Sequence, residues 1–131
     1  MKIFLFIVVT VFICSCDPMR RINIKNQSNE EVVVIWQIHK DSVLTSPMFI
    51  GNDPEVKYTL KQDPPFNLIK IPFGYGRWTT DYIKSVADDL KGLIVIKGSD
   101  SLHFNSTAQI WQYLEERKKG FGKKRIEIVI K

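Results

Sequence analysis

Cysteine is almost absent from this sequence: there are two, Cys14 and Cys16, both near the N-terminus. Residues 17–131 therefore contain no thiol, which excludes disulfides, cysteine-ligated zinc and a cysteine nucleophile from that part of the chain. A segment of this length buries enough apolar surface to fold without such cross-links. We expect it to be held together by packing alone.

Histidine is also scarce, and His39 and His103 are the only two. A catalytic zinc usually takes three protein ligands, so these histidines and the acids near them, Asp41 and Asp100, form a site only if the fold brings both segments together. Residues 98–102 place serines beside an acid but lack the Gly-x-Ser-x-Gly frame of a nucleophile elbow. They are predicted to form a polar turn after a strand. We therefore predict no enzyme, metal or cofactor. A small metal-dependent or serine hydrolase that uses His39, Asp100 and His103 is kept as an alternative.

The chain has no strong excess of positive charge, so its composition does not indicate a nucleic acid partner. The chain has 19 Lys and Arg against 14 Asp and Glu, spread along its length. The densest basic segment is 118–125, where lysines bracket Gly120-Phe121-Gly122. One interpretation is a patch for anionic lipid headgroups. The other, which the sequence favours, is a solvated turn whose lysines keep a sheet edge from pairing.

The longest apolar run, residues 3–13, is short. As a helix, its eleven residues extend about 16 Å at about 1.5 Å per residue, against about 30 Å for the bilayer core. With Lys2 before it, the run has the form of an export leader. The alternative, a buried first strand with two ordinary cysteines, would show alternation or bounding turn residues, and neither is present.

The apolar run ends in Ile13-Cys14-Ser15-Cys16. This tetrapeptide resembles the lipobox of bacterial lipoproteins, with Cys14 where serine or alanine is more usual. The resemblance implies cleavage after Ser15, a thioether from Cys16 to diacylglycerol, and acylation of the new amine by a fatty acid such as palmitate. Several acyl chains anchor a protein stably where one does not. We predict a signal peptide over residues 1–15, a lipidated tether over 16–21 and a single domain over 22–131.

Apolar stretches predict six strands, and helical spacing predicts two helices. The strands are 21–25, 31–38, 56–61, 66–71, 93–97 and 125–130, and the helices are 80–90 and 106–119. The first two strands, joined by turn residues 26–29, are predicted to form a hairpin, with 32–36 covered on both faces. The pattern predicts the α+β class, with a mainly antiparallel sheet of about six strands and one or two helices in the C-terminal half. A β-sandwich with helical insertions is the alternative.

One loop segment concentrates aromatic residues and is the candidate binding site: Phe73, Tyr75, Arg77 and Trp78. Exposed aromatic rings with a polar rim stack on sugars or anchor a protein partner. The segment lacks the third glycine of a phosphate-binding loop, because Thr79 occupies its place. In the alternative interpretation, Phe73 and Trp78 fold inward and cap the core.

Three features together resemble small lipoproteins of Bacteroidota-type bacteria: Ser15-Cys16-Asp17, the Ile-x-Ile-x-Asn-x-Ser pattern of residues 22–28, and the late strand–helix–strand. That group carries no established activity, so the resemblance implies location only. Surface-exposed lipoproteins of this type often carry an acidic run after the cysteine, which residues 18–21 lack. We therefore expect an outer-membrane anchor facing the periplasm. The sequences around Ser42 and Ser101 also resemble the O-glycosylation sequon of these bacteria, which implies that both serines lie on accessible loops.

The sequence thus favours a membrane-anchored, non-catalytic module that binds an envelope protein or a glycan through its loops. Besides the hydrolase, a purely structural envelope protein is an alternative, expected if Phe73, Tyr75 and Trp78 are all buried.

Overall fold

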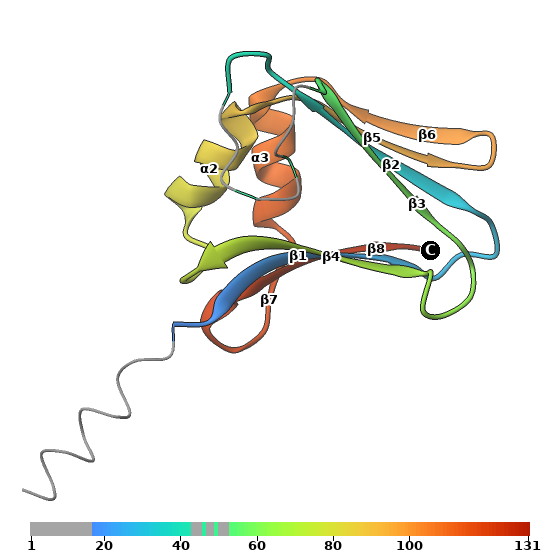
Figure 1. Cartoon of the computed structure of the whole chain (residues 1–131), viewed down its shortest axis with the longest axis horizontal. Coiled ribbons are helices and arrows are strands. Elements are labelled where there is room, and N and C mark those ends of the chain that lie inside the picture. The colour runs from blue at the N-terminus through green and yellow to red at the C-terminus, as the bar shows by residue number, and fades with distance from the viewer. Residues whose placement is uncertain (1–16, 43–45, 47–48, 50–52) are drawn as a thin grey trace, which may run out of the picture.

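The structure is a computed structural model that describes residues 17–42, 46, 49 and 53–131 (Figure 1). In these residues the chain forms eight strands and two α-helices. In chain order they are β1 (Met19–Asn26), β2 (Val32–Ile38), β3 (Glu55–Leu60), β4 (Leu68–Tyr75), α2 (Thr80–Asp88), β5 (Leu90–Lys97), β6 (Asp100–Phe104), α3 (Thr107–Glu115), β7 (Lys118–Lys119) and β8 (Arg125–Ile130), with a short 3-10 turn, η2 (Phe121–Lys123), before β8. Residues 1–16, which include the predicted signal peptide and Cys16, lie outside the described residues.

The strands form two four-stranded sheets. Sheet A has the order β4-β1-β8-β7, and sheet B has the order β3-β2-β5-β6. All neighbours are antiparallel except β1 and β8, which run parallel. The predicted α+β class, with mainly antiparallel strands and both helices in the C-terminal half, is confirmed. The strands are divided between two sheets, where the sequence analysis expected a single sheet of about six.

The core lies between the two sheets, which meet at an angle. They are close together at the right of Figure 1 and diverge to the left, where α2 and α3 fill the space between them. Strands β1, β2, β4 and β8 contribute alternate residues to this core, because successive side chains point to opposite faces. In β2, for example, Val32, Val34 and Trp36 are fully buried, whereas Val33 and Ile35 are only partly covered. The prediction that residues 32–36 are covered on both faces is met only in part: β2 is a central strand of sheet B, but its outer face stays partly exposed.

Both helices begin at side-chain caps. Thr79 accepts a hydrogen bond from the Tyr82 amide before α2, and Ser106 accepts one from the Gln109 amide before α3. Such caps satisfy amides that have no partner within the helix. The second helix was predicted to reach residue 119, but it ends at Glu115 because the chain turns there into β7.

The predicted hairpin between the first two strands is wrong, because β1 lies in sheet A and β2 in sheet B. The buried side chain of Asn26 explains this. Its Nδ2 donates to the carbonyl oxygens of Glu30 (2.8 Å), Lys61 (3.1 Å) and Leu60 (3.3 Å). Its Oδ1 accepts from the amide of Ser28 at 2.9 Å and from the hydroxyl of Ser28 at 2.7 Å. Asn26 therefore ties together the point where the chain crosses from one sheet to the other.

Replacing Asn26 with alanine is expected to lower the free energy of unfolding by about 2–3 kcal/mol, because it leaves buried carbonyl groups without donors. Urea denaturation measures this change. Asn29→Ala in the same turn is the matched control, since the Asn29 side chain is exposed and such positions usually change stability by less than about 0.5 kcal/mol. Equal midpoints for the two variants would contradict the role given to Asn26.

Strand β6 was missed by the sequence analysis, which assigned residues 98–102 to a polar turn. The turn occupies only the start of that segment, where Gly98 has a positive φ of 55°. Residues 100–104 then pair with β5 as the edge strand of sheet B. All but the last of them are exposed, so hydrophobic patterning carries little signal of the strand.

Candidate functional site

The aromatic segment 73–78 is divided between the core and the surface. Phe73 and Trp78 are each 1% exposed. They stand in a row of aromatic rings, Trp36, Phe49, Phe73, Trp78 and Tyr82, with neighbouring centroids 5.2–5.7 Å apart. Tyr75 and Arg77 are exposed. The structure thus agrees with the alternative interpretation for Phe73 and Trp78, and only Tyr75 and Arg77 present surface to a ligand.

The two histidines lie on different parts of sheet B. The backbone amide of His39 donates to the carbonyl of Asp89, just before β5, at 3.1 Å. His103 pairs with Ile94, five residues further along than Asp89, which corresponds to a separation of about 17 Å at about 3.3 Å per residue. Zinc–nitrogen bonds are about 2 Å long, so His39 and His103 do not share a metal. Among the described residues, no three His, Asp, Glu or Cys side chains are grouped to hold an ion.

His39 lies near Asp89 and not near the second imidazole. Burial raises the pKa of Asp89, whereas a hydrogen bond with Ser42 and the charge of His39 oppose that rise. Ser42 is thereby engaged in a contact within the fold and is half-buried. It lies on a loop, as the sequon resemblance implies, and is partly accessible there.

Ser101 and His103 are neighbours on one face of β6, with His103 Nε2 and Ser101 Oγ 2.9 Å apart. Both residues are exposed, and no acidic side chain of the described residues bonds to the imidazole. A serine nucleophile needs a base that is itself oriented by a third group. This geometry therefore gives no support to the hydrolase alternative. Ser101 is accessible, as the sequon resemblance implies, but it lies on a strand and not on a loop.

A groove of about 530 Å³ lies between the two sheets. One wall is the β5–β6 hairpin, the other is the C-terminal half of β8, and α3 closes one end. The lining combines apolar side chains with a polar rim: Val95, Leu102, Tyr113, Val129 and Ile130, together with Lys97, Asp100, Ser101, Arg117 and Lys131. None of these residues belongs to the predicted aromatic site.

The groove exists because β7 is only two residues long. Lys118 pairs with Ile126 and Lys119 with Arg125, and the amide of Glu127 donates to the carbonyl of Arg117 at 3.0 Å. Beyond Glu127, no strand of the described chain pairs with this edge of β8. The position where a full-length strand would lie is open, and this leaves Leu102 59% and Val129 41% exposed.

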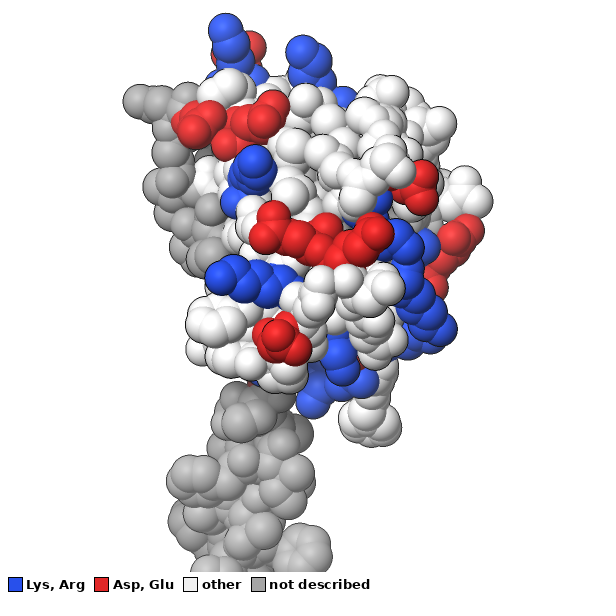
Figure 2. Space-filling model, turned by 90° about the vertical axis from the view of Figure 1, so that its right-hand side faces the viewer, with Lys and Arg blue, Asp and Glu red and all other residues white. Residues whose placement is uncertain are grey.

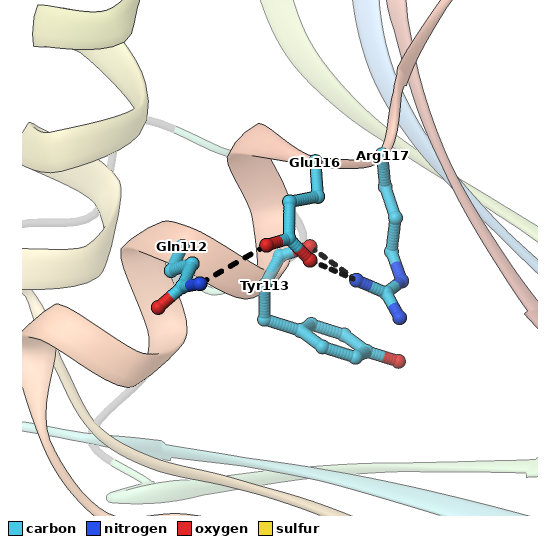
Figure 3. A network of polar contacts seen from close by, with 4 residues as sticks. All are labelled: Gln112, Tyr113, Glu116 and Arg117. Carbon is cyan, nitrogen blue, oxygen red and sulfur yellow. Dashed lines mark hydrogen bonds and ion pairs between the residues drawn. The ribbon is translucent and has the colours of Figure 1, made fainter.

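One end of the groove is built from the last turn of α3. The Arg117 guanidinium lies over the Tyr113 ring, 3.5 Å from its centroid, and its Nη1 donates to the Tyr113 carbonyl at 2.7 Å (Figure 3). Glu116 contacts the same Nη1 at 3.8 Å and accepts a hydrogen bond from Gln112. Burial raises the pKa of the Tyr113 hydroxyl, and the Arg117 charge opposes this. The tyrosine ring also packs against Phe104, with centroids 4.3 Å apart, so this wall is fixed on several sides.

The exposed apolar side chains of the described residues fall into separate groups. Six large ones are exposed. Leu102 and Val129 line the groove. Met19, Tyr75 and Phe121 lie at the end of sheet A where β1 begins, and Phe66 lies between β3 and β4 at the other end. Sequence reasoning missed the groove because Leu102 was assigned to a turn, and because no local pattern shows that it lies near the strand that contains Val129.

Comparison with known proteins gives no match: no family model matches the chain, and neither a curated protein nor a solved structure is similar to it. Among the described residues, no helix is long and apolar enough to cross a bilayer.

Proposed function

We propose that this chain is a lipid-anchored, non-catalytic module of the cell envelope that binds an extended segment of another envelope protein in the groove beside β8. The anchor is the predicted lipid on Cys16, and the location is the outer membrane, facing the periplasm. The open strand position beside β8 is the observation that carries the binding function. An exposed strand edge recruits a partner strand through main-chain hydrogen bonds, and side-chain pockets supply specificity.

The backbone of Val129 is placed to make such bonds. The carbonyls of Lys124 and Ile130 accept bonds from β1 and the residue after it. Lys124 and Ile130 have even residue numbers. Glu127 has an odd number, and its amide bonds to the Arg117 carbonyl on the side of β8 that faces away from β1. Because backbone groups alternate along a strand, the amide and carbonyl of Val129 point toward the groove. A segment that pairs there would continue the ladder that β7 begins.

The lining favours a peptide over a glycan. Sugar binding uses the open face of an aromatic ring, but the Tyr113 ring is covered by Arg117 on one face and contacts Phe104. The rim has three basic side chains, Lys97, Arg117 and Lys131, against Asp100. An extended segment in which apolar and acidic residues alternate matches this surface, because alternate side chains of a strand point in opposite directions.

The position of the anchor leaves the groove accessible. Only Asp17 and Pro18 separate Cys16 from β1, because β1 begins at Met19, so the tether is shorter than the predicted 16–21. Pro18 is itself held, since its carbonyl accepts a bond from the Gly76 amide at 2.7 Å. The groove lies at the opposite end of β8, five residues or about 17 Å along a strand parallel to β1. A partner therefore reaches it from the side away from the membrane.

In-cell photo-crosslinking tests this proposal. A photoreactive residue at position 102 is expected to capture an envelope protein through one extended segment, whereas the same residue at position 66 captures none. Leu102 and Phe66 are similarly exposed, at 59% and 64%, and they lie on opposite edges of the sheets. The captured segment, made as a peptide, should bind the purified protein.

A proline at position 129 tests the backbone contact. Val129→Pro removes one amide donor at an edge where proline is tolerated, and it is expected to weaken peptide binding about tenfold, which equals the worth of one hydrogen bond. Leu102→Glu should weaken it by repelling the acidic residues. Capture of a glycan, equal capture at positions 66 and 102, or unchanged peptide binding by both variants would overturn the proposal.

A further inference from the structure

Three segments that are far apart in the sequence meet at the end of sheet A where β1 begins (Figure 1). Met19 pairs with Tyr75. The amide of Arg21 donates to the Lys124 carbonyl at 3.2 Å, and the amide of Trp78 donates to the Lys123 carbonyl at 3.0 Å. We call the surface formed by residues 17–21, 75–78 and 118–125 the anchor-end surface, since Cys16 directly precedes it.

The net positive charge of the chain lies on this surface. Its three segments contain eight basic side chains and one acidic side chain, Asp17. The segments therefore carry a net charge of +7, whereas the whole chain carries +5, so that all other residues together carry −2. The opposite end, which faces the viewer in Figure 2, has acidic and basic side chains side by side. The charge is spread along the sequence, but the fold concentrates it at one end.

Several of these charges have no internal partner. Lys118 pairs with Glu115, and Arg125 pairs with Glu127. Within the described residues, Arg77, Lys119, Lys123 and Lys124 form no ion pair. These four charges are therefore available to an anionic surface outside the domain.

Apolar side chains project among these charges. Met19 is 47%, Tyr75 68% and Phe121 97% exposed. Phe121 stands between Gly120 and Gly122, both with positive φ, at the tip of the turn before β8. Lysines that only protect a sheet edge do not require an almost fully exposed phenylalanine beside them. Aromatic and aliphatic side chains ringed by Lys and Arg are typical of surfaces that enter the headgroup region of a bilayer.

We infer that the anchor-end surface docks on the membrane, with Phe121, Tyr75 and Met19 in the headgroup region and the unpaired basic side chains on anionic lipid headgroups. This rests on the lipid anchor of the proposed function and specifies the surface that the anchor presents to the bilayer. Asp17 and Pro18 span at most about 7 Å, so the lipid on Cys16 holds this surface close to the bilayer. A protein partner at this surface would therefore compete with the membrane for it. In the docked state, the strands of sheet A stand at a steep angle to the membrane plane, and the groove faces away from the membrane.

Proteolysis of the purified full-length protein in vesicles tests the docking. Trypsin cuts the turn at Lys119, Lys123 and Lys124 in detergent. In vesicles of phosphatidylcholine with phosphatidylglycerol, we expect this cleavage to slow about tenfold, since anionic headgroups hold basic side chains at the surface. Vesicles of phosphatidylcholine alone should protect the turn much less. Cleavage after Lys61, at the opposite end, should be equal in all three and serves as the internal control.

Two matched double variants give the second readout. Phe121→Ser with Lys119→Glu should abolish the protection at Lys123 and Lys124. Phe66→Ser with Lys25→Glu, the same chemical change at the opposite end, should retain it and leaves the Lys61 site intact as the internal control. Both pairs of side chains are exposed, and circular dichroism checks that each variant is folded. Equal protection in both kinds of vesicle, no protection in either, or protection that survives the Phe121 variant would overturn the inference.

Docking and lipidation can fail separately in this experiment. The chain is tethered at the same point by a lipid on Cys16 or, without processing, by the retained apolar leader, so protection is measured in either form. The mass of the N-terminal tryptic peptide reports the lipid independently. An unmodified peptide with a protected turn would refute the anchor and leave the docking surface standing, and a lipidated peptide with an unprotected turn would do the reverse.

Discussion

Replacing Cys16 with alanine is expected to abolish lipid modification and leave the chain with its leader uncut or release it from the membrane. The resemblance to the bacterial lipobox implies that this cysteine forms the thioether to the lipid, and alanine has no sulfur to form it. Each buried methylene contributes about 0.8 kcal/mol, and stable anchoring requires more than one chain. Loss of the lipid therefore removes the acyl anchor, and only an uncut leader would still hold the chain at the membrane. Membrane fractionation with the mass of the N-terminal peptide measures both outcomes.

Cys14→Ser is the matched control for this substitution. It removes the other cysteine two residues away and restores a residue that is common at that lipobox position. This variant should be cleaved, lipidated and anchored like the original protein. Normal processing and anchoring of the Cys16→Ala variant would refute the lipoprotein assignment, whatever the fold of residues 17–131.

Local patterns predicted most of the secondary structure, because those patterns are themselves the cause of the elements. The alternating isoleucines of β1 and β8 are one such pattern, and the side-chain caps of the two helices are another. Each determines the structure of residues only a few positions away. The association of strands into sheets follows from longer-range contacts. Asn26 in a turn sequence favours a hairpin on local grounds, but its side chain bonds to carbonyls of Leu60 and Lys61, which no local pattern contains.

The candidate sites were predicted less well for a related reason. Hydrophobicity alone cannot say whether an aromatic residue near a loop is inside or outside, and here Phe73 and Trp78 are inside while Tyr75 between them is outside. The groove exists because β7 is shorter than its neighbour β8. The anchor-end surface exists because the fold brings three separate segments together. Both features are defined by which strands are neighbours, and no local sequence pattern predicts that order.

Replacing Trp78 with alanine is expected to lower the free energy of unfolding by about 3–5 kcal/mol, the usual cost of removing a large buried aromatic side chain. The indole contacts the rings of Phe73 and Tyr82, with centroids 5.2 and 5.5 Å away. Its Nε1 also donates to the Arg21 carbonyl at 3.2 Å. Urea denaturation followed by circular dichroism measures the loss. Trp78→Phe, which keeps a ring but removes the donor, should be intermediate.

Tyr75→Ala is the matched control, three residues away in the same segment. The Tyr75 ring is 68% exposed, so its removal should change stability by less than about 0.5 kcal/mol. If Tyr75 serves membrane docking, the same variant should weaken protection of the 118–125 turn by anionic vesicles while the unfolding midpoint stays unchanged. The pair thus separates a residue that holds the anchor end together from one that this end presents to its surroundings. Similar losses of stability for Trp78→Ala and Tyr75→Ala would contradict that division.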